Sequence, residues 1–597
     1  MHCRRSGPWL LLCLTLFGVL RLDAAPYPGP QDGANRTWKR IVDGDIEVLG
    51  PVPDARLREA LEQVRGFRDL FSRIHPGLRL TSPTPTRVVV FPSNSALSRF
   101  APRDARGRRL SVGGFFGTGA ALNVMALDGS STDVLYHEFA HYLISLNLPQ
   151  LPNWLSEGLA EFYSTFDVDP KKGTMVVGKA PIERVRALRT RNYVPIDRIT
   201  DISGSQLSRL WRDPEGIGMY YAESWGLVHY LMLGREASEP AAFGRLVQAL
   251  GQGTAFAPAL QSAFGIDVPR LDSELKAYLR ARLSYPAVSL DLRTQNAAPS
   301  TVAAVSEADA RCVQGELLVR SGALDEAVQE IDAALALEPT HLGARIARGR
   351  LQTRQGHADD GIATLTQVAA SAPTSFAATY YLAASLANEW RYGEALELYS
   401  RATQLNAGSS EAWMGLSVSA LALGRTSQAN AAMVHALAAL ADPSLYRSRA
   451  EAAFGLGADE VAAEDVRHYL EATGWDSENA IYAGLLGAVA HLRVHQAERA
   501  RDLLDTARAA SARFPWTVNV IDFLDGRLTE PQLFDRAKSD GEKTEAHAYA
   551  GFKAAIDGRQ DQAQTHFEWV VTKGSRTYAE YTMVESELRR SKQTPPR

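Results

Sequence analysis

The spacing of hydrophobic and polar residues divides the first half of the chain into a mixed region and a helical region. Three short segments have the pattern of strands: Arg40–Val48, Arg87–Phe91 and Leu122–Leu127. Between the first two, Pro53–His75 has apolar residues at helical spacing and predicts an amphipathic helix. From Thr132 to Arg282 the pattern becomes almost wholly helical. These elements predict one mixed α+β domain.

We place this domain at residues 35–285. The Gly-rich stretch 113–117 is expected to form a turn before the third strand. Residues 286–307 are rich in Pro, Ala, Ser and Thr and lack a helical period, which predicts an inter-domain linker.

The second half of the chain repeats itself every 34 residues. Small residues recur where two helices of one unit would cross, and large apolar residues recur where the groove between them would be filled. This register is typical of tetratricopeptide repeats and predicts an all-α solenoid over residues 308–595. The positions in register are Gly315, Gly349, Ala383 and Ser417; Ala327, Gly361, Ala395 and Ala429; and Ile331, Leu365, Tyr399 and Met433.

Composition and charge narrow the classes of function. The 597 residues are 45% hydrophobic and 22% charged with a net charge of −4, which is typical of a globular protein and argues against a nucleic-acid partner. Arg4 and Arg5 precede an apolar run, and Ala24 and Ala25 follow it, as in a secretory signal over residues 1–25. We expect export to the periplasm or the extracellular space, with no stable membrane span unless this segment stays uncleaved. Without it, Cys312 is the one remaining cysteine.

The segment LYHEFAHYLI contains the pattern HExxH. His137 and His141 are four residues apart, so on a helix both imidazoles lie on one face and can reach one metal ion. Glu138 lies one step round the helix, where its carboxylate can accept a proton from a metal-bound water. A catalytic zinc site needs a third protein ligand and an open position. Glu157 follows His141 by sixteen residues on the next predicted helix and is the candidate third ligand.

These motifs resemble those of the gluzincin metallopeptidases, the clan of peptidase-MA-like enzymes. In that clan HExxH is followed, one helix later, by Trp-x-x-Glu-Gly-x-Ala, which Trp154–Ala160 matches at every fixed position. The resemblance implies a thermolysin-like domain in which His137, His141 and Glu157 bind Zn²⁺. It is nearest to uncharacterised secreted bacterial members that join this domain to tetratricopeptide repeats.

The resemblance suggests further site residues. In some members an acid at the offset of Glu161 orients a zinc-bound histidine, and the alternative for Glu161 is a solvated surface charge. A tyrosine on the helix after the site donates to the oxyanion in these families, and Tyr221 takes that place, with Tyr220 as its rival.

The strand that holds the substrate in the exopeptidase branch corresponds to Ala121–Ala126, and it has no acid here. We therefore expect no aminopeptidase activity. Asn123, Val124 and Met125 are expected to pair with an extended substrate.

The sequence thus predicts an exported zinc peptidase, most simply an endopeptidase, that hydrolyses peptide bonds by a zinc-bound water with Glu138 as general base. The repeats would recruit a substrate or another protein partner. Two alternatives stay open. The first is a catalytically inactive zinc-containing scaffold or protein-interaction module built on the repeats, and the second is an enzyme that cleaves another amide or an ester.

Overall fold

A computed structural model gives the fold of most of the chain, which divides into two compact units. One unit comprises Met1–Gln248, Phe256–Glu389 and Arg401–Ser409, and the other comprises Ala249–Ala255, Trp390–Ser400 and Ser410–Arg597. The predicted signal segment lies outside the residues that the structure describes. The described residues are 37–103, 107–129, 132–169, 174–190, 193–202, 210, 213–234, 240–281, 283, 285, 287–289 and 300–593.

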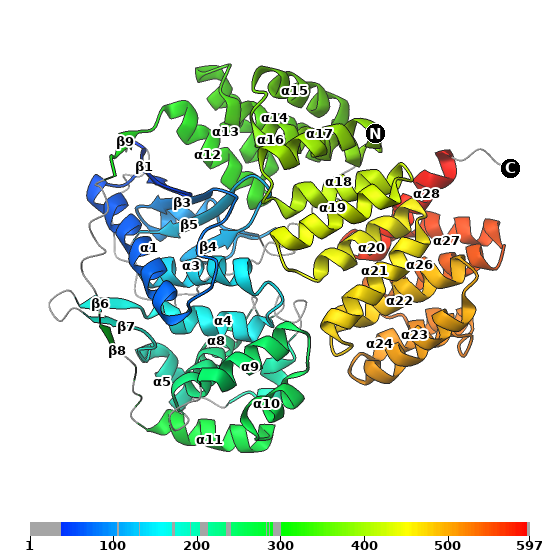
Figure 1. Ribbon diagram of the computed structural model, residues 1–597, viewed down its shortest axis with the longest axis horizontal. Helices are drawn as coiled ribbons and strands as arrows, with labels where there is room; N and C mark the ends of the chain where they lie inside the picture. The colour runs from blue at the N-terminus through cyan, green and yellow to red at the C-terminus, as the bar shows by residue number, and fades with distance from the viewer. Residues whose placement is uncertain are drawn as a thin grey trace. The chain divides into compact units, whose positions relative to one another are not determined.

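The first unit contains a six-stranded mixed sheet with the strand order β4-β5-β3-β2-β1-β9 (Figure 1). The central strands β2, β3 and β5 are parallel, whereas β4, β1 and β9 pair antiparallel with their neighbours. The strands are β1 Lys39–Asp43, β2 Ile46–Gly50, β3 Thr86–Phe91, β4 Gly114–Gly117, β5 Asn123–Asp128 and β9 Ala303–Ala304.

Two predicted local structures in this sheet are wrong. The segment Arg40–Val48 is not one strand but a hairpin of β1 and β2, because Gly44 has a φ of +58° and reverses the chain at Asp43–Asp45. The Gly-rich stretch 113–117 is not a turn. Its residues 114–117 form the strand β4, which pairs with β5 along its whole length.

Different helices cover the two faces of the sheet. Helices α1 (Asp54–Ile74) and α3 (Thr132–Asn147) contact one side of it. Side chains point alternately to the two faces of a sheet, so Leu49, Val89 and Val124 lie on the face opposite α1 and α3. These residues share a buried cluster with Leu317 and Leu318 of the first repeat. The first repeat therefore completes the hydrophobic core of the sheet.

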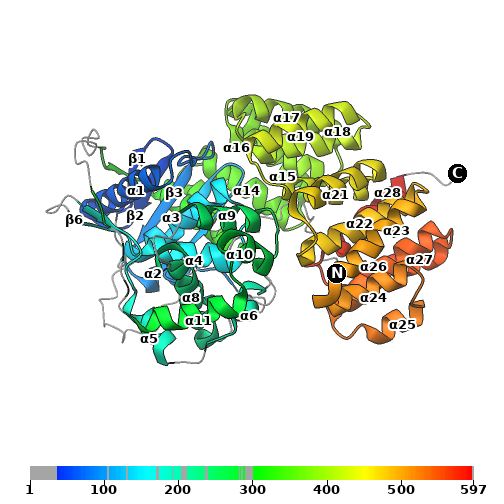
Figure 2. The same cartoon turned by 60° about the horizontal axis from the view of Figure 1, so that its bottom comes forward.

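The region after α3 is mainly helical, as predicted, but a small antiparallel sheet of β6, β7 and β8 interrupts it. Helices α5, α8 and α11 contact one another, as Figure 2 shows. The remaining elements of this region are α2 Asn94–Ser98, α4 Asn153–Ser164, β6 Asp167–Asp169, β7 Thr174–Val176, α5 Ile182–Thr190, α6 Ile196–Thr200, α8 Pro214–His229 with a π-helical end Tyr230–Gly234, α9 Pro240–Gly251, α10 Phe256–Phe264, α11 Val268–Arg280 and β8 Ala287–Ser289.

The rest of the chain forms the predicted all-α solenoid of helix pairs. A Cβ atom on Gly315 would lie 2.5 Å from Cδ1 of Ile331, and one on Gly349 would lie 2.6 Å from Cγ of Leu365, so the small residues stand where the paired helices cross. The helices are α12 Glu307–Arg320, α13 Leu324–Leu337, α14 Leu342–Arg354, α15 Ala358–Ser371, α16 Phe376–Asn388, α17 Tyr392–Leu405, α18 Ser410–Ala422, α19 Thr426–Ala439, α20 Ser444–Leu456, α21 Asp459–Thr473, α22 Glu478–Arg493, α23 Ala497–Ala510, α24 Pro515–Leu524, α25 Glu530–Arg536, α26 Asp540–Ile556, α27 Gln560–Lys573 and α28 Ala579–Gln593.

The boundary between sheet and repeats differs from the predicted one. Within the expected linker 286–307, β8 pairs with β7 and β9 pairs with β1. The compact unit that contains the sheet also extends through the first repeats to Glu389. Among the described residues, no helix is long and apolar enough to cross a membrane.

Candidate metal centre

Helix α3 places both histidines of HExxH in the interior of the first unit. Every residue from Val134 to Leu143 is buried, because the helix lies between the sheet and the helices that follow. His137 is 0% exposed and His141 is 2% exposed. Burial disfavours the charged form of a histidine and lowers the pKa of His141 to about 3, so its imidazole is neutral and can donate a lone pair.

Helix α4 brings the third candidate ligand to the same place. It begins at Asn153, directly after Pro152, whose fixed φ suits the start of a helix. The neighbour of Glu157, Gly158, allows α4 to approach α8 closely, since a Cβ atom there would lie 2.4 Å from the carbonyl oxygen of Ser224. Glu157 itself is fully buried.

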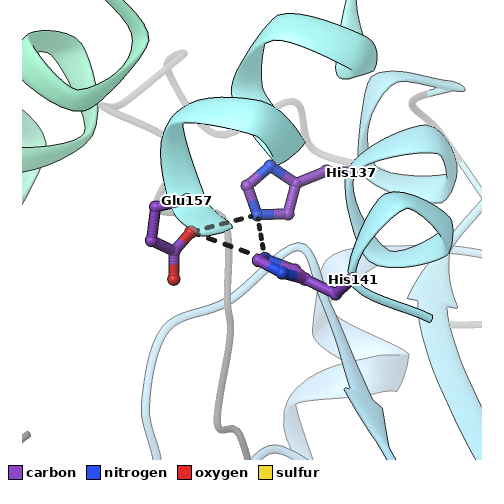
Figure 3. Close-up of side chains that lie close together, drawn as sticks. All are labelled: His137, His141 and Glu157. Carbon is purple, nitrogen blue, oxygen red and sulfur yellow. Dashed lines mark hydrogen bonds and ion pairs between the residues drawn. The ribbon is translucent and has the colours of Figure 1, made fainter. Parts of the chain in front are cut away.

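The three ligand atoms form a compact triangle (Figure 3). The Nε2 atoms of His137 and His141 are 3.1 Å apart, and an oxygen of Glu157 lies 3.5 Å from each of them. Figure 3 shows the two imidazoles on one helix and the carboxylate on the other, all directed at one point. Among the described residues, these three form the only group of at least three such side chains whose donor atoms lie this close together.

The triangle fits a tetrahedrally bound divalent cation. Ligands at about 2.0–2.1 Å from zinc stand roughly 3.3 Å from one another in a tetrahedron, which is close to the three observed separations. Both oxygens of Glu157 are buried without a hydrogen-bond partner among the described residues. Buried polar atoms in this state are costly unless something binds them, and a cation shared with the two imidazoles would satisfy them.

Glu138 is a buried carboxylate beside this triangle. It is 0% exposed, and neither of its oxygens has a hydrogen-bond partner of ordinary geometry within the described part of the chain. Burial raises the pKa of Glu138 well above its usual value, and the charge of Glu157 acts in the same direction. The backbone amide of Phe116, on β4, acts in the opposite direction. A carboxylate with a raised pKa is a stronger base than a solvated one.

Glu161 is buried and lies on the side of His137 away from the triangle, so it is not a solvated surface charge. One of its oxygens is 3.8 Å from Nδ1 of His137. Arg184, on α5, donates to both oxygens of Glu161 at 2.8 and 3.1 Å. Burial alone would raise the pKa of Glu161, but the positive charge of Arg184 and the hydrogen bonds that it donates outweigh burial and hold the pKa below its usual value. The sequence did not identify Arg184 as a site residue, because Arg184 belongs to no recognisable motif.

Both candidate tyrosines are buried on α8 close to the site. The ring of Tyr221 meets that of His137 edge-on at a centroid distance of 6.4 Å, and the guanidinium of Arg184 lies over its face. The hydroxyl of Tyr220 is buried and has no hydrogen-bond partner among the residues described. Burial raises the pKa of both phenols, with Glu157 adding to the effect, so both stay protonated and able to donate.

The predicted substrate-binding role of Asn123, Val124 and Met125 is wrong. Their strand, β5, is paired with β3 on one side and β4 on the other, so its backbone groups are already used. The Asn123 side chain is also occupied, since its Nδ2 donates to the carbonyl of Thr84 and its Oδ1 accepts from Gly119. The edge of the sheet at this end is β4.

Two family models match separate parts of the chain. Residues 135–247 match a family described as a protein of unknown function, DUF1570, and this range includes all the candidate site residues except those on β5. Residues 318–386 match the tetratricopeptide repeat. Neither match names a peptidase, and no match was found among curated proteins.

Solved structures resemble the chain over part of its length. Pseudomonas aeruginosa pilF is 17% identical over 35% of this chain and 92% of its own, with a TM-score of 0.28. A tetratricopeptide repeat protein from Parabacteroides merdae is 13% identical over 47% of this chain and 99% of its own, with a TM-score of 0.29. The tetratricopeptide match identifies repeats of that kind within residues 318–386, whereas the family that matches the range of the candidate metal site is described as of unknown function.

Proposed function

We propose that His137, His141 and Glu157 bind one divalent cation and that the first unit is a zinc-dependent hydrolase of the gluzincin type. Mixed imidazole and carboxylate ligands favour zinc. The observation that supports this most directly is the compact triangle of buried donor atoms, in which both Glu157 oxygens lack a hydrogen-bond partner among the described residues. When bound, zinc would lower the pKa of a water molecule and polarise a carbonyl group.

The other buried groups have the chemistry that hydrolysis of a peptide bond needs. Glu138 would accept the proton of the attacking water, which its raised pKa favours, and would then return it to the leaving amine. Tyr221 or Tyr220 would donate a hydrogen bond to the oxygen that becomes negative. Glu161, held by Arg184, would accept from Nδ1 of His137 and fix the orientation of that ring.

The sheet edge at β4 is the place where an extended peptide substrate could bind. Strand β4 contacts α3, and a Cβ atom on Gly114 would lie 2.5 Å from Cγ1 of Val134 and 3.4 Å from Cγ of Glu138. Among the described residues β4 pairs with a strand on one side only, so its outer edge can hydrogen-bond an added strand. We therefore move the expected substrate contact from β5 to β4.

A protein-interaction role for the repeats has firmer support than peptidase activity. The tetratricopeptide family match supports such a role directly, and no comparison supports hydrolysis. The second candidate function is therefore an interaction scaffold in which the metal only stabilises the fold. Glu138 favours the enzyme, since a structural metal site has no use for a buried, unpaired carboxylate beside its ligands.

We retain export as a proposal that rests on the N-terminal sequence.

A digest of a peptide library tests the enzyme against the scaffold. The zinc-loaded protein should cleave peptides, and Glu138→Gln should retain zinc but lose cleavage by a factor of roughly 100 to 10,000. Glu183→Gln, at an exposed position of α5, is the matched control and should cleave normally. Zinc binding without any cleavage by the wild type would favour the scaffold. Undiminished cleavage by Glu138→Gln would refute its role as general base.

A further inference from the structure

A second cluster of side chains that can bind a metal lies near the C-terminal end of the chain. His547 is on α26, His566 is on the next helix, α27, and Glu530 is on α25. All three helices belong to the second compact unit. The cluster is therefore separate from the candidate metal centre, whose residues belong to the first unit.

The two imidazoles of this cluster meet through the same atom of each ring. Nδ1 of His547 lies 3.0 Å from Nδ1 of His566. Two nitrogens at about 2.0 Å from one ion stand roughly 2.8 Å apart at right angles and roughly 3.3 Å apart in a tetrahedron. The observed separation falls between these values, so both Nδ1 atoms can reach one ion with little movement of the two helices.

Glu530 lies at the other ring nitrogen of His566. Oε1 of Glu530 is 3.2 Å from Nε2 of His566, and Gln562 donates to Oε2 of Glu530 at 2.7 Å. The carboxylate favours a proton on Nε2 of His566, which leaves a lone pair on Nδ1 of that ring. A carboxylate at the outer nitrogen of a histidine is the arrangement that orients histidine ligands in metal sites.

Aromatic rings hold His547 in place. The indole of Trp569 stacks on His547 at a centroid distance of 3.9 Å and an interplanar angle of 12°, and the ring of Phe534 lies 4.5 Å away. Burial lowers the pKa of His566 and lowers that of His547 to about 4, so both imidazoles are neutral at pH 7. Each neutral ring can offer one lone pair to a cation.

The number and kind of ligands indicate which ion would bind. Among the described residues no third histidine, cysteine or carboxylate completes this cluster, so water would fill the other positions of the ion. Imidazole suits copper, and Cu²⁺ is the divalent first-row ion that a given set of ligands binds most strongly. The positive charges of Lys573 and Arg559 act on the two rings and would limit the affinity. Zinc would be held less strongly here than copper.

We propose that His547 and His566 form a second metal site, which binds Cu²⁺ through their Nδ1 atoms, with Glu530 as a positioning residue. On binding, the proton on Nδ1 of His547 moves to Nε2 of the same ring, so that both Nδ1 lone pairs face the ion. The proposal does not depend on zinc binding or on hydrolysis in the first unit.

Titration of the full chain with copper chloride tests the proposal. The protein is first loaded with zinc, and binding is measured in competition with a copper chelator that suppresses weaker sites. The parent should bind one Cu²⁺, and its electron paramagnetic resonance spectrum should show coupling to two nitrogens. His547→Asn and His566→Asn should each weaken binding roughly tenfold or more, and Glu530→Gln should weaken it roughly 10–100-fold.

His435→Asn is the matched control, because His435 stacks on Trp413 at 4.3 Å but does not belong to the cluster. It should bind copper as the parent does. Circular dichroism shows whether each variant is folded, and Glu530→Gln tests the site without removing a ligand. The proposal is overturned if the parent binds no copper, if the spectrum shows fewer than two nitrogens, or if the folded His547→Asn and His566→Asn bind like His435→Asn. Unchanged binding by Glu530→Gln would refute its positioning role.

Discussion

Gly158 should be required for the close packing of α4 on α8 that positions Glu157. An added Cβ atom would lie 2.4 Å from the carbonyl oxygen of Ser224 and 2.6 Å from Cγ2 of Val228. Both distances are below the 3.0 Å that real Cβ contacts respect, and one of the two atoms is backbone, which does not rotate away. Forcing extra volume into a packed core costs about 1–3 kcal/mol.

The expected effect of Gly158→Ala is a loss of both stability and zinc affinity. Alanine in a helix gains about 1 kcal/mol over glycine, so the net destabilisation should be about 0–2 kcal/mol, and the displaced α4 should move Glu157 away from the histidines. Zinc affinity, measured by competition with a chelating dye, reports the second effect separately from denaturant unfolding. The control is Gly244→Ala in α9, where an added Cβ meets nothing within 4 Å and should leave zinc affinity unchanged. Equal zinc affinity in the two variants would refute the argument.

Three further predictions concern the core, the site and the pH dependence. Leu317→Ala, in the cluster that the first repeat shares with the sheet, should destabilise the first unit by about 2–5 kcal/mol in denaturant unfolding. Arg184→Met should lower zinc affinity by roughly 10–100-fold, because Glu161 loses both of its hydrogen bonds from Arg184. Burial raises the pKa of Glu223 to about 7, so the folded state binds its proton more tightly than the unfolded state and stability should fall as the pH rises from about 4.5 to 7. Glu223→Gln should remove that part of the pH dependence, roughly 1–3 kcal/mol at pH 8.

Matched controls make these predictions specific. Leu337→Ala, at a position that is 54% exposed, should unfold like the wild type. Arg186→Met, at an exposed position of the helix that bears Arg184, should keep normal zinc affinity. A shared core would be contradicted by an undisturbed Leu317→Ala, and the role of Arg184 by equal zinc binding in both arginine variants. Parallel pH profiles of the wild type and Glu223→Gln would contradict the assignment of the titrating group.

The sequence was most informative where one chemical requirement fixes a spacing. The four-residue interval between His137 and His141 and the position of Glu157 on the next helix were sufficient to predict that the three side chains meet. The 34-residue period predicted the helix pairs, because each crossing needs a small residue opposite a large one, as at Gly315 and Ile331. Both features depend on helical geometry over short stretches of chain.

The sequence failed where the outcome depended on contacts between distant segments. The position of β4 at the edge and of β5 inside the sheet follows from the strand order, which no local pattern records. Arg184 reaches Glu161 from a separate helix, and the first repeat packs on the sheet through side chains that look like any other repeat residues. Gly44 was a local signal that could have been used, since Asp-Gly between two apolar runs favours a hairpin.

The zinc content of the purified protein is the most direct test of the account. After loading with zinc and dialysis, the wild type should retain about one zinc ion per chain by mass spectrometry of the metal. Glu157→Ala should retain much less, since it removes one of the three ligands. Absence of zinc from the loaded wild type, or an equal zinc content in Glu157→Ala, would contradict the claim that His137, His141 and Glu157 form a metal site.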